Sequence, residues 1–290
     1  MVERCSALLR GGVPPARALA MVAEHSGSPA SDAAAATIRT ALAEGMRPVR
    51  ALAAADTPEW RVVAAVWHLA EQSGSPLAPA LQSIAAALRE LARMRERRTV
   101  LLAGPQATVR MVAALPILSL ILSVLLGFDP VPVLVSPVGA ALAVLGMGLL
   151  GLGVGWSRAL QRRVAALDHV AGLEFELAWV ALGGGAPASL ACRRVVDAVD
   201  QVGAEWVGFD AFMNDSSLLA TIRAGTRAGV PLGPLLLEQG RAARAASVAN
   251  LERGAERLGV RVLVPLGVCV LPAFIVLGVL PVLLSMFGAV

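Results

Sequence analysis

The sequence predicts an all-α membrane protein with two homologous cytoplasmic helical bundles and three transmembrane helices. Three observations predict this fold class: long uncharged runs, arginines at the ends of those runs, and a motif that occurs twice. Hydrophobic residues make up 57% of the 290 residues and charged residues only 16%, against roughly 45–50% and 25% in soluble domains. Signals for β-strands are nearly absent. Part of the chain is therefore expected to lie in lipid.

The expected boundaries divide the chain into four segments. Residues 1–106 form a first cytoplasmic bundle, 107–157 a transmembrane hairpin, 158–258 a second cytoplasmic bundle, and 259–290 a C-terminal transmembrane helix. Each boundary is placed where charged, arginine-bearing sequence gives way to uncharged sequence or the reverse. The chain is thus expected to alternate between cytoplasm and membrane.

The first bundle is expected to contain short helices separated by glycine and proline. In Thr57-Pro58-Glu59, a threonine that can cap a helix precedes a proline at the first helical position and an acid in the first turn. The other expected boundaries are a stop at Gly11-Gly12, a start at Pro14-Pro15, a helix from Ser31 to Gly45, an end near Gly74, and a longer helix from Ser75-Pro76 through Arg93–Arg98.

Three uncharged runs are long enough to cross a membrane. They are Met111–Phe128, Pro130–Ser157 and Val262–Val290, and about 20 helical residues span a hydrocarbon core of about 30 Å. The first two runs are expected to form a hairpin whose turn covers residues 127–137, with Asp129, Pro130, Pro132 and Pro137 breaking the helix, since proline interrupts a helix. Three prolines in the last run predict kinked packing against neighbouring helices.

The arginines predict the orientation of these spans. Cytoplasmic flanks of membrane spans carry an excess of basic residues. Basic residues flank the same end of each run: Arg93, Arg95, Arg97, Arg98 and Arg110 before the first, Arg158, Arg162 and Arg163 after the second, and Arg253, Arg257 and Arg261 before the third. We therefore expect a multi-pass plasma-membrane protein with its N-terminus in the cytoplasm and its C-terminus outside.

The second bundle is expected to follow the same scheme as the first. A long helix reaches Leu182, three glycines interrupt it, and Pro187 begins the next helix. A further helix begins at Ser216 or Ser217 and fades at Gly225. The last helix of this bundle opens at Gly229 and Pro231 and carries Arg241, Arg244, Arg253 and Arg257.

A short motif indicates internal duplication. Gly74-Ser-Pro-Leu-Ala-Pro-Ala-Leu81 matches Gly229-Val-Pro-Leu-Gly-Pro-Leu-Leu236, and at the same offset Arg89 falls on Arg244. In each copy the motif precedes an arginine-bearing helix that leads into a span. Such self-similarity is a fold-level signal.

No residue pattern indicates catalysis, a cofactor or a metal. A Walker A loop needs a lysine to reach the nucleotide phosphates, and all 25 basic residues are arginine. The letters of a dinucleotide fingerprint occur at Gly146–Gly151, but within a span, where small residues allow close helix packing. His68 and Glu71 share a helix face without the further ligands that a metal needs.

Charge and cysteine content exclude two further classes. The net charge of +4 and the membrane-flanking arginines do not indicate nucleic-acid binding. Cys5, Cys192 and Cys269 have no CxxC spacing, and an odd number argues against a disulfide framework.

The sequence resembles the type II secretion system F family, which includes platform proteins of type II secretion, type IV pili and tight-adherence (Flp-type) pili. The matching elements are Leu9-x-Gly-Gly-x-Pro-Pro, Gly45 with its helix, and Ala70-Glu71-Gln-Ser-Gly74-x-Pro-Leu77. The tail from Ala255 to Pro265 and Leu271-Pro272-Ala-Phe274 looks like the closing segment of tight-adherence members. Thr226 stands where Glu71 stands in the first copy, so a role for the acid does not transfer there.

The resemblance implies a non-enzymatic inner-membrane platform. It would dock a cytoplasmic secretion ATPase, act with a paralogous F-family subunit or a second copy of itself, and help move pilin-like subunits out of the bilayer. The residues expected to serve as turn or partner-contact elements are Glu71, Gly74, Pro76, Leu77, Gly229, Pro231, Leu232 and Arg241. The alternative interpretation of these eight residues is that they cap and start helices.

Two other functions are compatible with the sequence. A small polytopic permease or channel is one, although no ionisable residue lies deep in a span, where transporters usually place them. A membrane-anchored regulator is the other, and it would require a cytoplasmic ligand pocket.

Overall fold

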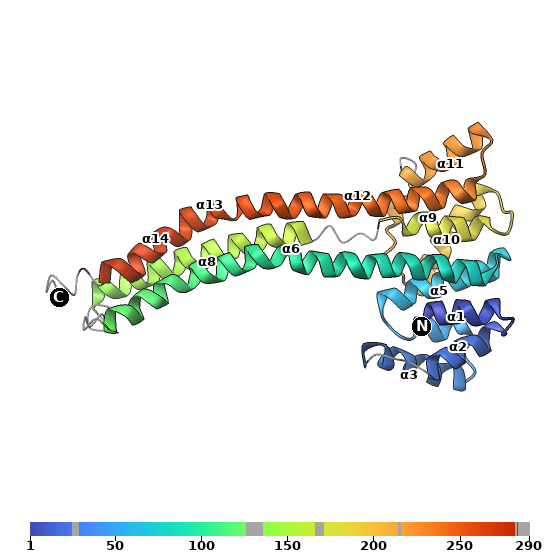
Figure 1. Ribbon diagram of the computed structural model, residues 1–290, viewed down its shortest axis with the longest axis horizontal. Helices are drawn as coiled ribbons and strands as arrows, with labels where there is room; N and C mark the ends of the chain where they lie inside the picture. Colours follow the sequence, from blue (N-terminus) through green and yellow to red (C-terminus); the bar gives the residue numbers. More distant parts are fainter. Residues whose placement is uncertain (25–28, 126–135, 166–170, 214–215, 282, 284–290) are drawn as a thin grey trace. The chain divides into compact units, whose positions relative to one another are not determined.

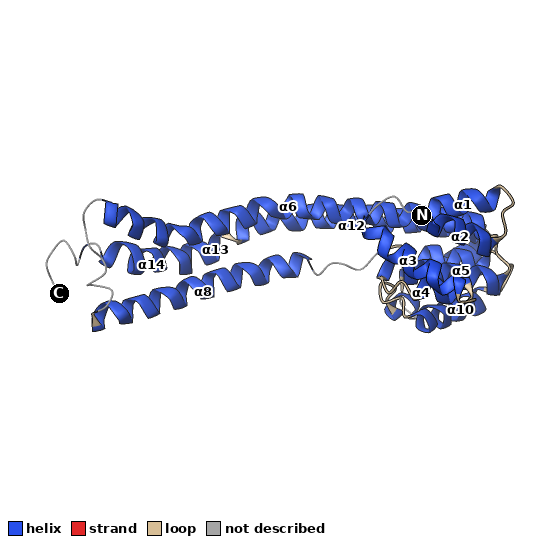
Figure 2. Cartoon of the chain, turned by 90° about the horizontal axis from the view of Figure 1, so that it is seen from below, coloured by secondary structure: helices blue, strands red, loops and turns tan. Residues whose placement is uncertain are grey.

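A computed structural model describes residues 1–24, 29–125, 136–165, 171–213, 216–281 and 283 (Figure 1). The described residues are helical with connecting loops and contain no strand (Figure 2). This confirms the all-α prediction for the described part of the chain. Asp129, Pro130 and Pro132 of the predicted hairpin turn and the end of the third predicted span lie outside the described residues.

The chain divides into two compact units. Unit 1 comprises Met1–Met94 and His169–Val248, and unit 2 comprises Arg95–Asp168 and Ala249–Val290. Helices of both predicted cytoplasmic bundles therefore belong to unit 1. The four-segment division and the separation into two homologous bundles stay predictions.

The first part of unit 1 follows the expected punctuation. Thr57 caps α5 by accepting a hydrogen bond from the Trp60 backbone N–H at 3.4 Å, and Pro58 is the first helical residue, as predicted. One short helix, α4, was not predicted. The helices are α1 (Val2–Arg10), α2 (Pro15–Glu24), α3 (Pro29–Ala43), α4 (Pro48–Ala53), α5 (Pro58–Ser73) and the start of α6 (Leu77–Leu125).

The second part of unit 1 departs from prediction in two places. The long helix expected to reach Leu182 is wrong, because a separate helix starts after Gly172, whose φ of 92° is left-handed. The helix expected to fade at Gly225 continues to Ala228, and Ser216 caps it by accepting from the Leu219 N–H at 3.2 Å. The elements are α9 (Leu173–Leu182), α10 (Ala188–Val202), η1 (Phe209–Phe212), α11 (Ser217–Ala228) and the start of α12 (Leu232–Arg261).

One hydrophobic core joins the two parts of unit 1. Helix α5 packs against α4 from the first part and against α9 and α10 from the second. Trp67 lies at its centre with 1% of its surface exposed, and Leu177 and Val195 of the second part belong to the same buried cluster. A smaller cluster joins α9, α11 and α12 through Phe175, Leu218 and Leu236. Helix α9 therefore contributes to both clusters.

Unit 2 is formed by long apolar helices. The rest of α6, α8 (Pro137–Ala165) and the end of α12 are followed by α13 (Leu263–Pro265), η2 (Leu266–Val270), α14 (Leu271–Phe274) and η3 (Ile275–Val279). Within the described residues, Gly139–Arg162 and the helical run Leu232–Val279 are long and apolar enough to cross a membrane. The first predicted span has a described apolar helical part, Val109–Ser119.

Glycines set the close packing of α8 against the C-terminal helices. A Cβ at Gly153 would lie 2.8 Å from Val270 Cγ2, and one at Gly146 would overlap the Leu277 side chain. Gly148, Gly151 and Gly155 would meet no described atom within 4 Å. Of the glycines in the expected packing stretch Gly146–Gly151, Gly146 thus allows close packing, whereas Gly148 and Gly151 do not.

The last helical run changes its winding near prolines. Pro265 and Pro272 lie in α13 and α14, and a π-helical segment follows each. Proline lacks the N–H that an α-helix needs and clashes with the preceding turn, and π-type insertions accommodate such sites. The winding of this span thus changes after Pro265 and Pro272, while the predicted kinked packing stays a prediction.

Candidate partner-contact turns and a buried charged network

The first predicted contact element is the turn between α5 and α6. Helix α5 ends at Ser73, and Gly74 adopts φ 71° and ψ 16°, a left-handed conformation that glycine reaches without the steric cost of a Cβ. Pro76 is exposed, and Leu77 begins α6 and packs against the main core of unit 1. The turn thus ends one helix and anchors the next.

Glu71 lies one turn before Gly74 and is held from two sides. Its Oε1 accepts a hydrogen bond from Trp67 Nε1 at 2.8 Å, and its Oε2 lies 3.3 Å from Arg47 Nη2. Arg47 precedes the first residue of α4, so the carboxylate connects α4 with the end of α5. With 37% of its side chain exposed, Glu71 remains accessible at the surface.

The second predicted element has the same local geometry. Gly229 ends α11 with φ 66° and ψ 22°, and Leu232 begins α12. A Cβ at Gly225 would lie 2.6 Å from Leu232 Cδ2, so Leu232 packs directly on α11. Thr226, which replaces the acid of the first copy, donates its hydroxyl to the Ile222 carbonyl at 2.8 Å. It therefore bonds within its own helix.

Pro231 and Arg241 are exposed residues at and beyond the start of α12. Arg241 Nη1 lies 3.5 Å from Glu238 Oε2, three residues earlier on the same helix, with 68% of the arginine side chain exposed. Exposed pairs of this kind contribute about 0–1 kcal/mol to stability. Arg241 is thus available at the surface.

Both turn elements contact α9 or the loop after it. A Cβ at Gly183 would lie 3.1 Å from Ser75 Cβ, and one at Gly184 would overlap the Ser73 carbonyl. A Cβ at Gly233, next to Leu232, would lie 3.4 Å from Trp179 Nε1. Gly183 and Gly184, two of the three glycines predicted only as a helix breaker, therefore also allow the first turn to approach.

A buried charged network was not predicted. Arg244 of α12 is 5% exposed; its Nη2 lies 3.1 Å from Glu176 Oε1, and its Nε lies 2.9 Å from Glu90 Oε2. Ser83 of α6 donates its hydroxyl to the other Glu176 oxygen. A sequence signal existed: Glu176 is an acid within the apolar segment Leu173–Leu182, and buried acids need a partner.

Cysteine chemistry is suppressed in unit 1. Burial raises the pKa of the Cys5 thiol to about 11, against an opposing effect of the N-terminal amine. Burial also raises the pKa of Cys192. Since the thiolate is the reactive form, neither thiol is activated. Among the described residues, no three His, Cys, Asp or Glu side chains form a group able to hold a metal.

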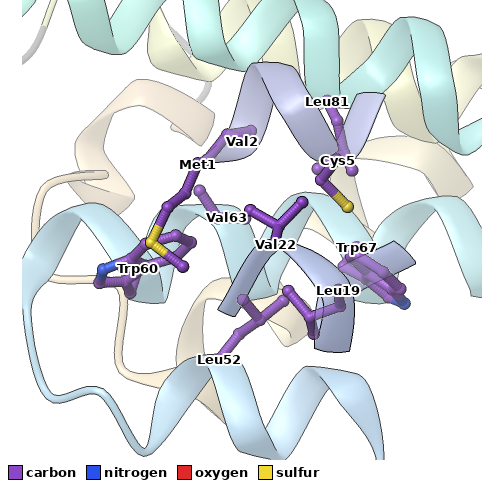
Figure 3. A pocket seen from close by; sticks show the side chains of 10 residues that line it. All are labelled: Met1, Val2, Cys5, Leu19, Val22, Leu52, Trp60, Val63, Trp67 and Leu81. Carbon is purple, nitrogen blue, oxygen red and sulfur yellow. The ribbon is translucent and has the colours of Figure 1, made fainter. Parts of the chain in front are cut away.

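A small cavity lies in the first part of unit 1 (Figure 3). It holds about 10 Å³, at most the room for one water molecule. The lining side chains are apolar apart from the Cys5 thiol and the indole N–H groups of two tryptophans, of which Trp67 already donates to Glu71. The residues are Met1, Val2, Cys5, Leu19, Val22, Leu52, Trp60, Val63, Trp67 and Leu81.

Comparison with known proteins gives one family. Residues 1–125 match the family model described as type II secretion system (T2SS), protein F, a range that ends with the last residue of α6. No curated protein matches the chain. Residues 1–125, the part of the chain from α1 to the end of α6, are therefore similar to the type II secretion system F family.

Proposed function

We propose that the chain is a non-enzymatic inner-membrane platform protein of a type II secretion or tight-adherence pilus assembly machine. It docks the cytoplasmic secretion ATPase and couples the ATPase cycle to extraction of pilin-like subunits from the bilayer. The observation that carries the proposal is the family match over residues 1–125. The apolar helices Gly139–Arg162 and Leu232–Val279 support a membrane location by length and composition.

The energy source is expected in a partner. A P-loop requires a lysine, and this chain has none. Along Gly139–Trp156 and Leu263–Val279, all described, no acidic or basic side chain occurs. A carrier for charged substrates usually places such groups within its spans, so these segments favour the platform over the permease alternative.

Deletion of the gene tests the function directly. We expect loss of surface pili or of the secreted substrate, with recovery when the wild-type chain is restored. Normal filaments and normal secretion after a clean deletion would exclude the proposal. Substrate flux in vesicles that contain only this protein would favour a permease instead.

The proposed contact surface includes Glu71 and the turn at Gly74–Leu77. Glu71→Gln retains an oxygen that can accept from Trp67 Nε1, but it removes the charge that pairs with Arg47. We expect less ATPase to co-purify with this tagged variant from membranes, at an unchanged melting temperature. Glu44→Gln, an exposed acid in the loop before α4, is the matched control. Equal co-purification of the two variants would remove Glu71 from the contact surface.

The proposed topology places both parts of unit 1 in the cytoplasm, with three spans and the C-terminus outside. Single cysteines at the exposed positions Ala54 and Ala224, in a chain whose own cysteines are replaced, test this. Both should react with a membrane-impermeant maleimide only after the cytoplasmic side is opened. Labelling from opposite faces would contradict the topology.

A further inference from the structure

Unit 2 carries exposed arginines on three helices that pack together. They are Arg110 on α6, Arg158 and Arg162 on α8, and Arg257 and Arg261 on α12. The sequence explains them as charges flanking membrane spans, without assigning them a ligand. Their three-dimensional grouping indicates more than orientation.

The five arginines lie close in sequence to members of one buried apolar cluster of unit 2, so they lie at similar positions along the three helices. The buried members beside the arginines are Val109, Leu258 and Val262, and Val154 and Leu160 pack against them. Arg110 follows Val109 directly, and Arg261 precedes Val262. Arg158 lies between the two α8 members. Figures 1 and 2 both show α6, α8 and α12–α14 side by side in this unit.

These five arginines have no acidic partner among the residues that the structure describes. Arg97, farther from the apolar segments on α6, contrasts with them because its Nη1 lies 3.4 Å from Glu252 Oε1. Glu256 is the described acid nearest to Arg257 and Arg261 in sequence, and it forms no ion pair with either of them. The positive charge of these five arginines is thus not neutralised by a described acid and is available to bind a ligand.

The surface next to the arginines is apolar and exposed. On α8, Leu152 is 63% and Met147 59% exposed, and beyond α12, Val264 and Val268 are 54% and 62% exposed. Trp156 is 44% exposed and lies between this apolar surface and Arg158. Tryptophan favours the boundary between hydrocarbon and headgroups. The arginine, tryptophan and apolar side chains therefore follow one another in the same order as the headgroups, the interface and the hydrocarbon of one bilayer leaflet.

We propose that these arginines form a binding surface for the phosphate groups of anionic phospholipids. A guanidinium group donates two parallel hydrogen bonds to a phosphate, and basic clusters beside membrane helices attract anionic lipid. The apolar surface next to them covers the acyl chains of the same lipids. The inference goes beyond the platform function and requires only that the apolar helices of unit 2 lie in a bilayer.

Native mass spectrometry of the full chain in detergent tests the proposal. Phosphatidylglycerol and phosphatidylcholine are titrated in turn, and bound lipids are counted. The wild type should retain phosphatidylglycerol preferentially. The variant Arg158→Gln/Arg162→Gln/Arg257→Gln/Arg261→Gln should lose this preference, with binding about fivefold weaker per arginine removed. The same four positions changed to lysine should retain most of it.

The matched control replaces four exposed arginines of unit 1, Arg17, Arg39, Arg50 and Arg193, with glutamine. Its binding should equal that of the wild type. Retention of the preference in the unit 2 variant, equal binding of the two lipids by the wild type, or displacement of the lipid by inorganic phosphate would each overturn the proposal. If the fourfold variant does not give a monodisperse protein, Arg158→Gln and Arg261→Gln alone should each weaken binding about fivefold.

Discussion

Single residues decide how charge is accommodated inside unit 1. Glu176 and Arg244 are both nearly fully buried, with side-chain exposures of 4% and 6%. Removing two charges from water is costly, so such a pair stabilises a fold weakly, while loss of one partner leaves an uncompensated charge. Glu90, the second acid bound to Arg244, is 42% exposed. The two acids should therefore contribute unequally.

Glu176→Leu is expected to lower the free energy of unfolding by about 3–5 kcal/mol, because Arg244 stays charged and buried without its buried partner and keeps only the half-exposed Glu90. The double variant Glu176→Leu/Arg244→Leu should recover most of this loss. Glu90→Gln should cost only about 0–1 kcal/mol. Urea unfolding of the detergent-solubilised protein, followed by circular dichroism, measures all three. Equal effects of the Glu176 and Glu90 substitutions would contradict the assignment of a buried pair.

Cys5 gives a residue-scale prediction with a defined pH dependence. Since the pKa of its thiol is raised to about 11, the thiolate fraction at pH 8 is about a hundredfold below that of an unshifted thiol with a pKa of about 9. Alkylation of Cys5 should be correspondingly slow and should accelerate about tenfold per pH unit until pH 11. Site-resolved mass spectrometry measures the rate. The same protein unfolded in detergent is the control, and rapid labelling of the folded protein at pH 8 would contradict the burial.

At the scale of elements, the spacing between helices in unit 2 is set by a few glycines. Gly146 and Gly153 of α8 lie against Leu277 and Val270, whereas Gly148 and Gly151 of the same helix meet no described atom. Close-packed interiors tolerate little added volume. The same substitution of glycine by a larger residue should therefore have opposite effects on stability on the two sides of α8.

Gly146→Leu and Gly153→Leu are expected to lower the melting temperature of the protein in detergent, since the added side chains overlap the C-terminal helices. Overpacking typically costs about 1–3 kcal/mol. Gly148→Leu and Gly151→Leu should leave it unchanged or raise it, because leucine favours a helix by up to about 1 kcal/mol over glycine. A thermal shift assay compares the four variants. Similar destabilisation by both pairs would show that α8 packs through a different face.

On the scale of the whole molecule, unit 1 is assembled from two distant parts of the chain. The contact between Ser75 and Gly183 crosses this division, and a Cβ at Gly183 would lie 3.1 Å from Ser75 Cβ. Disulfides need Cβ atoms about 3.5–4.5 Å apart, which a small shift of the exposed loop reaches. The contact therefore allows a covalent test of the shared core.

Ser75→Cys/Gly183→Cys, with the native cysteines replaced, should form an intramolecular disulfide on mild oxidation, because the two positions are neighbours in the folded chain. Protease cleavage between them followed by non-reducing electrophoresis detects the link. Ser75→Cys/Gly185→Cys is the control, since a Cβ at Gly185 meets no described atom within 4 Å. Failure of the first pair to cross-link, or equal cross-linking of both pairs, would contradict the shared core.

The sequence determined the helical class, the apolar segments and most helix ends, because these depend on local chemistry. A helix cap such as Thr57 with Pro58 affects only the residues next to it in sequence. The same is true of the left-handed glycines Gly74 and Gly229, and the long uncharged runs are continuous in sequence. The first turn was predicted correctly, with a helix end near Gly74, whereas α11 was predicted to end at Gly225 and ends at Ala228, with Gly229 as its cap. Whether a partner binds the two turns depends on surfaces that no local pattern encodes.

Only the tertiary structure decided which distant residues meet. It placed α5 against α9 and α10, brought the glycines after α9 to the first turn, and paired Glu176 with Arg244. It also split the expected long helix at Gly172, where the backbone of α12 approaches at Gly240 and leaves no room for a Cβ. Such contacts depend on shape and burial across many residues of chain, whereas helix propensity and capping depend on neighbours along it.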